Sequence, residues 1–402
     1  MRDSFVQSRR ALLRMGAGAG LVGVAGLPGL AIGATGGEAR FVLVILRGGM
    51  DGLSAVPAHG DPAHASARGA LASPPPGAPG GGLVLDGTFS LAPELAGLHR
   101  LYGAGEMLVV HATCSPYLER SHFDGQNVLE NGTARPYGAD DGWLNRALAA
   151  MPAGGSDRDL GVAIAAQMPL ALRGPARVTS WSPTIAPPVD ADTVARIARL
   201  YAERDAALAE ALTRGQDANA MAGSGQGGQG RDPFVTLAEA AARFLTPEEG
   251  PRVAVLEIGG WDTHARQLGA YSALLRNFAT LDAGIAALAS GLGPVWDRTV
   301  VVMATEFGRT VAGNGTDGTD HGTGGAMILA GGAVAGGRVV ADWPGLGPRD
   351  LLEGRDLRPT TDMRAVLKGV LGDHLKLSRA ALDGAVFPDS SGVKAMGGLL
   401  RG

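Results

Sequence analysis

Four loops in this 402-residue sequence carry acidic residues, and three of the four also carry histidines. They read GGMDGLS, TCSPYLERSHFDGQ, GGWDTHARQ and TEFGRTVAGNGTDGTDHGTGG, and each follows an apolar run. A turn needs glycine and asparagine for its backbone geometry, but it does not need a carboxylate beside an imidazole. Mixed carboxylate and imidazole donors are instead typical ligands of zinc, manganese and related divalent ions. The pattern therefore predicts a divalent metal site.

Six side chains in these loops are candidate metal ligands: Asp51, Asp262, His264, Glu306, Asp320 and His321. Each also has an ordinary structural explanation. Asp262 suits a helix cap, and His264 suits packing on the helix that would follow. Glu306 suits an ion pair with a nearby arginine, while Asp51 and the Asp320–His321 pair suit polar turns. The recurrence of acids after the apolar runs favours the metal site over these separate explanations.

The second loop adds a candidate nucleophile. Ser121, His122 and Asp124 follow the apolar run there, and Ser121 alternatively suits a helix N-cap with Asp124 in the first helical turn. His111 ends the same run and stays undecided. The other histidines lack acidic neighbours after a strand, so we expect no function for His59, His64, His99 and His374.

The elements that must position these loops are visible as short apolar runs rich in β-branched residues. Such runs are typical of strands that are covered on both faces. They lie at residues 40–47, 106–112, 160–166, 252–258, 298–304 and 326–332, with helical patterns at 192–215, 236–245 and 271–292. This alternation predicts a three-layer α/β/α fold with a largely parallel sheet. In such sheets ligands bind at the carboxyl ends of the strands, where the four loops begin.

The composition limits the classes of partner. The formal net charge of −4 gives no indication of nucleic-acid binding or of a polybasic membrane patch. Cys114 is the only cysteine, which excludes an intramolecular disulfide and a cysteine-rich zinc site. We expect residues 40–402 to form a single domain with no membrane span.

The N-terminus has the pattern of an export signal. SRRALLR at residues 8–14 precedes the apolar segment from Met15 to Ala34. A basic region, a Gly/Ala/Leu stretch and a small-residue end are typical of a signal peptide, and the paired arginines resemble a twin-arginine signal. A transmembrane anchor or a buried helix is the alternative. We expect residues 1–33 to be a signal peptide, the export machinery to be a partner, and the protein to be periplasmic or secreted.

Several motifs together resemble one known family. LRGGMDGLSAVPAHGDP, SHFDGQNVLENG, GGWDTHARQ, the Thr305–Gly325 loop with its continuation, and DWPGL look like the DUF1501 family of exported bacterial proteins. The resemblance spans roughly Arg40 to Pro388. That family is placed in the alkaline phosphatase superfamily, with sulfatases and cofactor-independent phosphoglycerate mutases. The resemblance therefore implies an alkaline phosphatase-like fold.

The resemblance also implies roles for individual residues. Asp51 matches a ligand of one metal, Ser121 is the best placed nucleophile, and Asp262 with His264 match ligands of the other metal. The chain departs from the pattern at Glu306 and Phe307, where the superfamily has an Asp and a His. His321 then matches the last loop histidine with Asp320 as an added ligand or a supporting partner, or Asp320–His321 is itself the missing pair.

The resulting hypothesis is an exported hydrolase of phosphate or sulfate esters that uses one or two zinc or manganese ions. Arg47, Arg120 or Arg309 would hold the ester oxygens, and we select Arg309 as the catalytic candidate. The rival hypothesis is a non-catalytic exported binding or assembly protein with a degenerate metal site. A Ser-His-Asp esterase is a weaker alternative, because the sequence contains no G-x-S-x-G elbow.

The paired arginines generate a direct test of export. Replacing Arg9 and Arg10 by Lys should leave the precursor in the cytoplasm, because a twin-arginine route depends on both guanidinium groups. Immunoblots of cytoplasmic and periplasmic fractions measure the outcome, with Arg14→Lys as the matched control. An unchanged periplasmic yield in the double variant would contradict this route.

Overall fold

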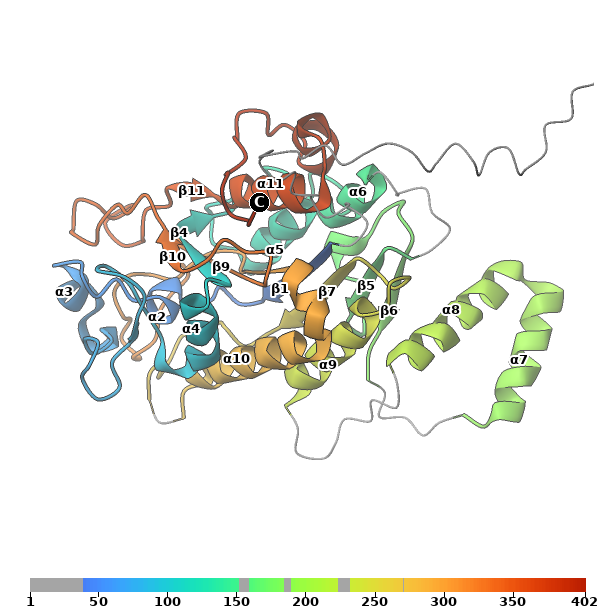
Figure 1. Cartoon of the computed structure of the whole chain (residues 1–402). Coiled ribbons are helices and arrows are strands. Elements are labelled where there is room, and N and C mark those ends of the chain that lie inside the picture. Colours follow the sequence, from blue (N-terminus) through green and yellow to red (C-terminus); the bar gives the residue numbers. More distant parts are fainter. Residues whose placement is uncertain (1–38, 152–158, 184–188, 223–231, 270) are drawn as a thin grey trace, which may run out of the picture. The chain divides into compact units, whose positions relative to one another are not determined.

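A nine-stranded mixed sheet lies at the centre of the fold, in the order β10-β4-β9-β8-β1-β7-β5-β6, with β11 paired to β4 (Figure 1). β9 is antiparallel to its neighbours β4 and β8, and the other pairs are parallel. The strands are β1 (Arg40–Leu46), β4 (Met107–Cys114), β5 (Gly161–Ile164), β6 (Val178–Trp181), β7 (Val253–Ile258), β8 (Thr299–Ala304), β9 (Gly325–Ala330), β10 (Arg338–Val340) and β11 (Thr361–Asp362). A separate hairpin pairs β2 (Leu83–Val84) with β3 (Ser90–Leu91).

This computed structural model describes residues 39–151, 159–183, 189–222, 232–269 and 271–402. The predicted signal peptide at residues 1–33 lies outside the described residues and stays a prediction. The boundaries predicted for a single domain at 40–402 likewise stay a prediction.

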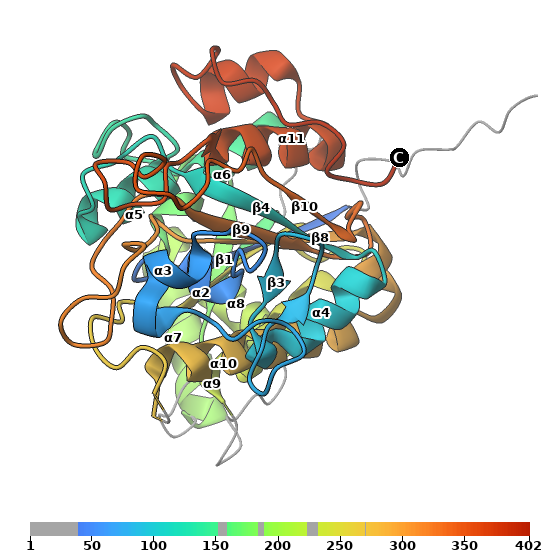
Figure 2. The same cartoon turned by 90° about the vertical axis from the view of Figure 1, so that its left-hand side faces the viewer.

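Helices cover both faces of the sheet. Figure 1 shows α4 (Ala96–Gly103), α9 (Pro233–Leu245) and α10 (Ala273–Leu292) on one face, with α6 (Trp143–Ala150) and α11 (Met363–Leu375) on the other, and the turned view in Figure 2 agrees. The remaining α-helices are α2 (Gly52–Ala55), α3 (His64–Arg68), α5 (His122–Asn131), α7 (Ala191–Arg204) and α8 (Ala206–Ala222). The prediction of a three-layer α/β/α fold with a largely parallel sheet is confirmed.

Two hydrophobic cores lie on opposite faces of the sheet, and they explain why the sequences of the strands are continuously apolar. Successive residues of β1 face opposite layers, so Val42 and Val44 pack in one core while Leu43 and Ile45 pack in the other. All four are at most 1% exposed. Because every position of the strand is buried, the alternation of polar and apolar residues seen in half-exposed strands is lost.

The six predicted strands are present, but the helical pattern at 192–215 was predicted as one helix and is two. Asp205 interrupts it with extended backbone angles, and its carboxylate accepts hydrogen bonds from the N–H groups of Ala207 and Leu208. Asp205 is therefore the N-cap of α8, and a capping side chain competes with continuation of the helix. The N-cap of α7 is Asp190, two residues before the start of the predicted helical pattern.

The segment Ala273–Arg298, which contains α10, is apolar and long enough to cross a membrane by length and composition alone. It is a core helix in the fold. Its buried residues recur on one face, at Leu274, Phe278, Leu281, Ile285, Leu288 and Leu292. This spacing is that of an amphipathic helix packed on a sheet.

The strand directions bring the four loops to one edge of the sheet. β7 and β8 are both parallel to β1. β4 runs in the same direction, because β9 is antiparallel to both β8 and β4. The loops after β1, β4, β7 and β8 therefore leave from the same edge, as the sequence predicted.

His111 in β4 generates a prediction about stability. The ring is fully buried, its Nε2 donates to Val56 O at 3.0 Å, and its Nδ1 accepts from the Ala112 N–H at 2.8 Å, which fixes the neutral tautomer. Burial lowers the pKa of His111 from 6.5 to about 4. The unfolded chain therefore takes up the proton first as pH falls from about 6.5 to about 4, and the stability that His111 contributes is lost in that window.

The measurement is the urea midpoint of unfolding at pH 7 and pH 5. Wild type should lose about 2 kcal/mol more than His111→Gln between these values, since one pKa unit corresponds to about 1.4 kcal/mol. His99→Gln, at a partly exposed ring, is the matched control and should follow wild type. Equal losses in wild type and His111→Gln would refute a buried neutral ring.

Candidate metal centre

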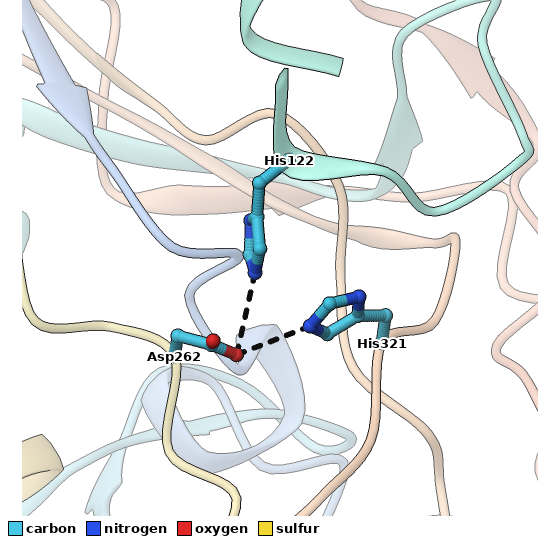
Figure 3. A group of neighbouring side chains, drawn as sticks. All are labelled: His122, Asp262 and His321. Carbon is cyan, nitrogen blue, oxygen red and sulfur yellow. Dashed lines mark hydrogen bonds and ion pairs between the residues drawn. The ribbon is translucent and has the colours of Figure 1, made fainter. Parts of the chain in front are cut away.

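His122, Asp262 and His321 form the centre of the site (Figure 3). His122 Nε2 lies 3.3 Å from Asp262 Oδ1, and His321 Nε2 lies 3.2 Å from the same oxygen. One ligand atom from each residue lies within 4.8 Å of the others. Among the described residues, no other group of three or more His, Cys, Asp or Glu side chains meets this spacing.

These separations fit one tetrahedral ion. Zinc binds nitrogen and oxygen donors at about 2.0–2.1 Å, so two ligand atoms at a tetrahedral angle lie roughly 3.3 Å apart. Two of the three separations among the ligand atoms, 3.3 Å and 3.2 Å, are close to this value. Two imidazoles and one carboxylate are also the donor types that zinc and manganese accept.

Each of the three residues comes from a different loop at the same sheet edge. His122 is the first residue of α5, Asp262 follows β7, and His321 lies between β8 and β9. The loop after β1 must pass very close to Asp262, because a Cβ on Gly48 would lie 2.7 Å from the Asp262 backbone nitrogen. Gly48 also has φ +123°, which side chains rarely adopt, so glycine is needed there on both counts.

Glu306 holds His122 in position. Its Oε1 accepts a hydrogen bond from His122 Nδ1 at 2.8 Å, so the lone pair of the neutral ring is on Nε2, facing Asp262. That Nε2 is buried and has no hydrogen-bond partner. Burial alone would raise the pKa of Glu306, but hydrogen bonds from His122 and Gln126 lower it. The same bond to Glu306 raises the pKa of His122 against the effect of burial.

Backbone and ring contacts hold His321. Its Nδ1 donates to Arg120 O at 2.8 Å, which again leaves the Nε2 lone pair facing Asp262. Burial lowers the pKa of His321, and the nearby charges of His122 and Arg309 lower it further, so the ring favours the neutral form that binds metal. Phe307 packs against the rings of His122 and His321, with centroids 4.8 Å and 5.2 Å apart.

Arg309 holds Asp262. Its Nη1 donates to Asp262 Oδ1 at 2.5 Å, and its remaining donors bind the Thr319 hydroxyl and carbonyl. Arg309 is 1% exposed. Burial would raise the pKa of Asp262, but the hydrogen bond and charge of Arg309 lower it, so the carboxylate is charged.

His264 and Asp320 lie at the rim of this centre. His264 Nε2 is 2.9 Å from Asp262 Oδ1 and 3.1 Å from His321 Nε2. On the other side of the ring, His264 Nδ1 is 3.3 Å from Asp320 Oδ1. His264 nevertheless falls outside the group of three. A Cβ on Gly318 would lie 2.1 Å from the His264 carbonyl carbon, so the Asp320 loop reaches His264 only because residue 318 is glycine.

Asp51 does not join the centre. It is 1% exposed, and its Oδ2 accepts from Arg68 Nη2 at 2.7 Å, from the Ser54 hydroxyl at 2.8 Å and from Gln267 Nε2. Its Oδ1 caps α2 by accepting from the Leu53 and Ser54 N–H groups. Burial would raise the pKa of Asp51, but Arg68 lowers it. Asp51 was expected to be a metal ligand. In the structure the charge of its carboxylate is already balanced by Arg68.

Ser121 is the N-cap of α5. Its side chain accepts from the Asp124 N–H at 3.5 Å and lies beside Tyr117. None of the contacts found in the described residues joins its hydroxyl to His122, Asp262 or His321. Arg47 and Arg120, the other candidate oxygen-binding residues, are paired with carboxylates: Arg47 with Glu130 and Glu257, and Arg120 with Glu353 and Asp356.

Comparison with known proteins bears on the resemblance. Residues 111–387 match the family described as "Protein of unknown function (DUF1501)", which is more than half of the chain. The chain belongs to the DUF1501 family. The predicted family is thereby confirmed. None of the curated proteins compared with the chain matches it.

Three solved structures are similar to this DUF1501 protein. Ps i-CgsB in complex with k-i-k-neocarrahexaose is 10% identical, with TM-score 0.42, over 88% of this chain and 76% of that one. The lipoteichoic acid synthase LtaP from Listeria monocytogenes is 10% identical, with TM-score 0.40, over 89% and 76%. Murine ectonucleotide pyrophosphatase/phosphodiesterase 5 with AMP is 9% identical, with TM-score 0.35, over 75% and 91%. At these scores the likeness is loose, so the roles of individual residues rest on the side chains of this chain alone.

In this DUF1501 protein, sequence reasoning missed one residue that faces the centre. His122 was placed in the correct loop, but it was not included among the candidate ligands. The signal that identifies it is its position at the start of α5, after the loop that follows β4, together with a buried glutamate elsewhere in the chain. Sequence spacing cannot reveal that pairing, because Glu306 is 184 residues away.

The centre predicts how variants change metal binding. His122→Ala and His321→Ala should each lower zinc affinity roughly a hundredfold or more, because each removes one of three donors. Asp51→Asn should keep the affinity but lower the free energy of unfolding by about 3–5 kcal/mol, since it leaves Arg68 buried without its charge partner. Zinc titration of chelator-treated protein, with circular dichroism to monitor folding, measures both quantities.

His99→Ala is the control and should bind zinc as wild type does. Full affinity in both the His122 and His321 variants would exclude this centre. Loss of zinc in a folded Asp51→Asn variant would return Asp51 to the ligand set.

Proposed function

We propose that the protein is an exported, metal-dependent hydrolase of phosphate or sulfate esters that uses one divalent ion, zinc or manganese. The observation that carries the proposal is the convergence of His122 Nε2 and His321 Nε2 on Asp262 Oδ1 at separations of 3.3 Å and 3.2 Å. The side chains of these residues are between one-fifth and two-fifths exposed, with His122 Nε2 itself buried, so the centre lies at the protein surface. A structural zinc site is usually closed with four protein ligands, whereas a site with three ligands keeps a position for substrate.

A divalent ion held by these three residues would supply Lewis-acid polarisation of a phosphoryl or sulfuryl oxygen. The protein side chains around it set the geometry. Glu306 keeps the proton of His122 on Nδ1, and the Arg120 carbonyl does the same for His321. Both rings thus present a lone pair without any rearrangement, which is the usual function of partners behind metal-binding histidines.

His264 is suited to carry a proton. Its two ring nitrogens face Asp262 Oδ1 at 2.9 Å and Asp320 Oδ1 at 3.3 Å, so hydrogen bonds to carboxylates are available on both sides. In the proposed reaction a water oxygen bonds to phosphorus or sulfur and the bond to the ester oxygen breaks. His264 Nε2 gives its proton to the leaving oxygen and regains the one that the water releases. The products are an alcohol and phosphate or sulfate.

The family resemblance implies that Ser121 is the nucleophile, but in the structure the Ser121 hydroxyl caps the N-terminus of α5. We therefore assign the attack to water. Arg309 was the candidate for binding the ester oxygens, but its donors are directed to Asp262 and Thr319. We assign to Arg309 the role of fixing Asp262.

A second candidate function is a non-catalytic binding or assembly protein that keeps one metal. The observation that favours it is the ion pair between Asp51 and Arg68. By resemblance Asp51 matches a ligand of a second ion, but its carboxylate is bound to the Arg68 guanidinium instead. Both candidates retain the export proposal, which the SRRALLR signal supports.

The role of His264 can be tested with two esters that differ in leaving group. A 4-nitrophenyl group leaves without protonation, whereas a phenyl group needs a proton. His264→Ala should therefore lower kcat for phenyl phosphate or phenyl sulfate roughly a hundredfold, and lower it little for the 4-nitrophenyl ester. Zinc content should stay as in wild type. Assays with zinc and with manganese supplied separately measure both.

Ser121→Ala is the matched variant. It should keep turnover and lose about 1 kcal/mol of stability, as expected for a lost helix cap. If it abolishes turnover while the protein stays folded, Ser121 is the nucleophile and the water mechanism is wrong. If wild type hydrolyses none of these esters with either metal, the non-catalytic function replaces the hydrolase.

A further inference from the structure

A cavity of about 580 Å³ lies beside the metal centre. Its walls come from three segments that are distant in sequence: the α3 region, the loop after β8, and the loop that follows β10. This volume is within the range of pockets that enclose small organic ligands, about 300–1,000 Å³. It is far larger than the space that a metal ion and a phosphate or sulfate group require.

Residues of the cavity wall are bonded to the metal centre and to its rim. Asp320 lines the cavity, and its Oδ1 lies 3.3 Å from His264 Nδ1. Asn314 also lines it and donates to the same Asp320 oxygen at 3.1 Å. Arg355 lines it too, and its Nη2 donates to the carbonyl oxygen of His321 at 2.7 Å. A molecule in the cavity therefore borders the residues that hold two of the imidazoles.

The cavity wall contains both polar and apolar side chains. Asp320, Asn314 and Arg355 are the polar residues linked to the metal centre, Ser66 and Thr310 are further polar residues, and the apolar side chains include Ala63, Ala67, Val311, Leu346, Pro348 and Leu351. A wall of this kind suits an apolar group whose polar end points to the centre.

The part of the cavity wall that comes from the loop after β10 is held in place by hydrogen bonds. The Asp61 carboxylate accepts from the Leu346 N–H at 3.0 Å and from Trp343 Nε1 at 2.9 Å. These bonds join the loop after β10 to the segment just before α3. Because the contacts that form the cavity are present in the protein alone, a ligand would not have to order this loop on binding.

A second cavity, of about 770 Å³, contains Ala265, Arg266, Leu268 and Tyr271 in its wall. Its wall does not contain Asp320 or Arg355. The smaller cavity is therefore the one whose walls are joined to His264 and His321.

We propose that the 580 Å³ cavity binds the apolar alcohol part of the ester, the group that leaves when the ester is cleaved. This inference rests on the proposed hydrolase function and adds a substrate class to it: esters of aryl-sized or larger apolar alcohols. The bond between phosphorus or sulfur and the alcohol oxygen breaks, its electron pair stays on that oxygen, and the oxygen takes a proton from His264 Nε2. The alcohol product is then the molecule that the cavity holds.

The test fills the cavity from α3 and uses a neighbouring alanine as the matched control. Ala67 lines the cavity, whereas Ala65 lies on the same helix, is exposed, and is not part of the wall. Ala67→Trp should weaken binding of 2-naphthol at least tenfold by calorimetry, and Ala65→Trp should leave it unchanged. Zinc affinity should be the same in both variants, which shows that the metal centre is intact.

Turnover gives the second readout. Relative to wild type, Ala67→Trp should lower kcat/KM at least tenfold for 2-naphthyl phosphate or sulfate and less than twofold for the methyl ester. Equal losses for both esters, or no loss for either, would overturn the assignment of the cavity. If wild type turns over the naphthyl ester but does not bind 2-naphthol, only the cavity proposal fails. If wild type binds 2-naphthol and cleaves no ester, the hydrolase function fails and the leaving-group role fails with it.

Discussion

The oxygen Oδ1 of Asp262 is the atom on which the whole site depends. Four nitrogen atoms, from His122, His264, His321 and Arg309, lie between 2.5 Å and 3.3 Å from it. They come from three loops at one edge of the sheet, so the parallel direction of β1, β4, β7 and β8 is what makes the meeting possible. The fixed positive charge of Arg309 neutralises the carboxylate and opposes any second cation beside it. A divalent ion at this centre would be held mainly by imidazole nitrogens, which would suit an exchangeable catalytic ion better than a tightly bound structural one.

Arg309 is itself positioned by a buried polar chain that ends at Arg68. Thr319 accepts from Arg309 and donates to Gln267, and Gln267 donates in turn to Asp51, which pairs with Arg68. A buried network of this kind is stable only when every member has its partner. The carboxylate of Asp51, which the family resemblance assigned to a second metal, is required by this network. This constraint explains in physical terms why the described residues contain one group of candidate metal ligands instead of two.

The fold was predictable from the sequence because strands that are buried on both faces have continuously apolar sequences, which can be recognised directly. The six runs are six strands, and the loops after four of them lie at one edge. Three short strands at the edges of the sheet, β6, β10 and β11, have two to four residues each and are too short to show this pattern. The break at Asp205 was missed because an aspartate inside a helical pattern reads equally well as an exposed helical residue.

The site was predictable as a set of residue types but not as a set of roles. Asp51 and Asp262 follow strands in the same manner, and only the partner distinguishes them: a buried Arg68 for one and three imidazoles for the other. Partners that come from distant segments cannot be read from local spacing. His122 was overlooked for the same reason, since the carboxylate that turns its lone pair toward the metal centre lies on another strand.

The two residues that depart from the superfamily pattern, Glu306 and Phe307, have a common physical explanation. A glutamate at the end of β8 reaches three donors at once, the Gly48 N–H, His122 Nδ1 and Gln126 Nε2, and it remains fully buried while doing so. Phe307 then fills the space behind His122 and His321 with an apolar ring. The two residues at which the chain departs from the resemblance therefore support the one candidate centre here. Glu306 fixes the position of the proton on His122, and Phe307 restricts the ring orientations of His122 and His321. Both rings therefore face Asp262 before any substrate binds.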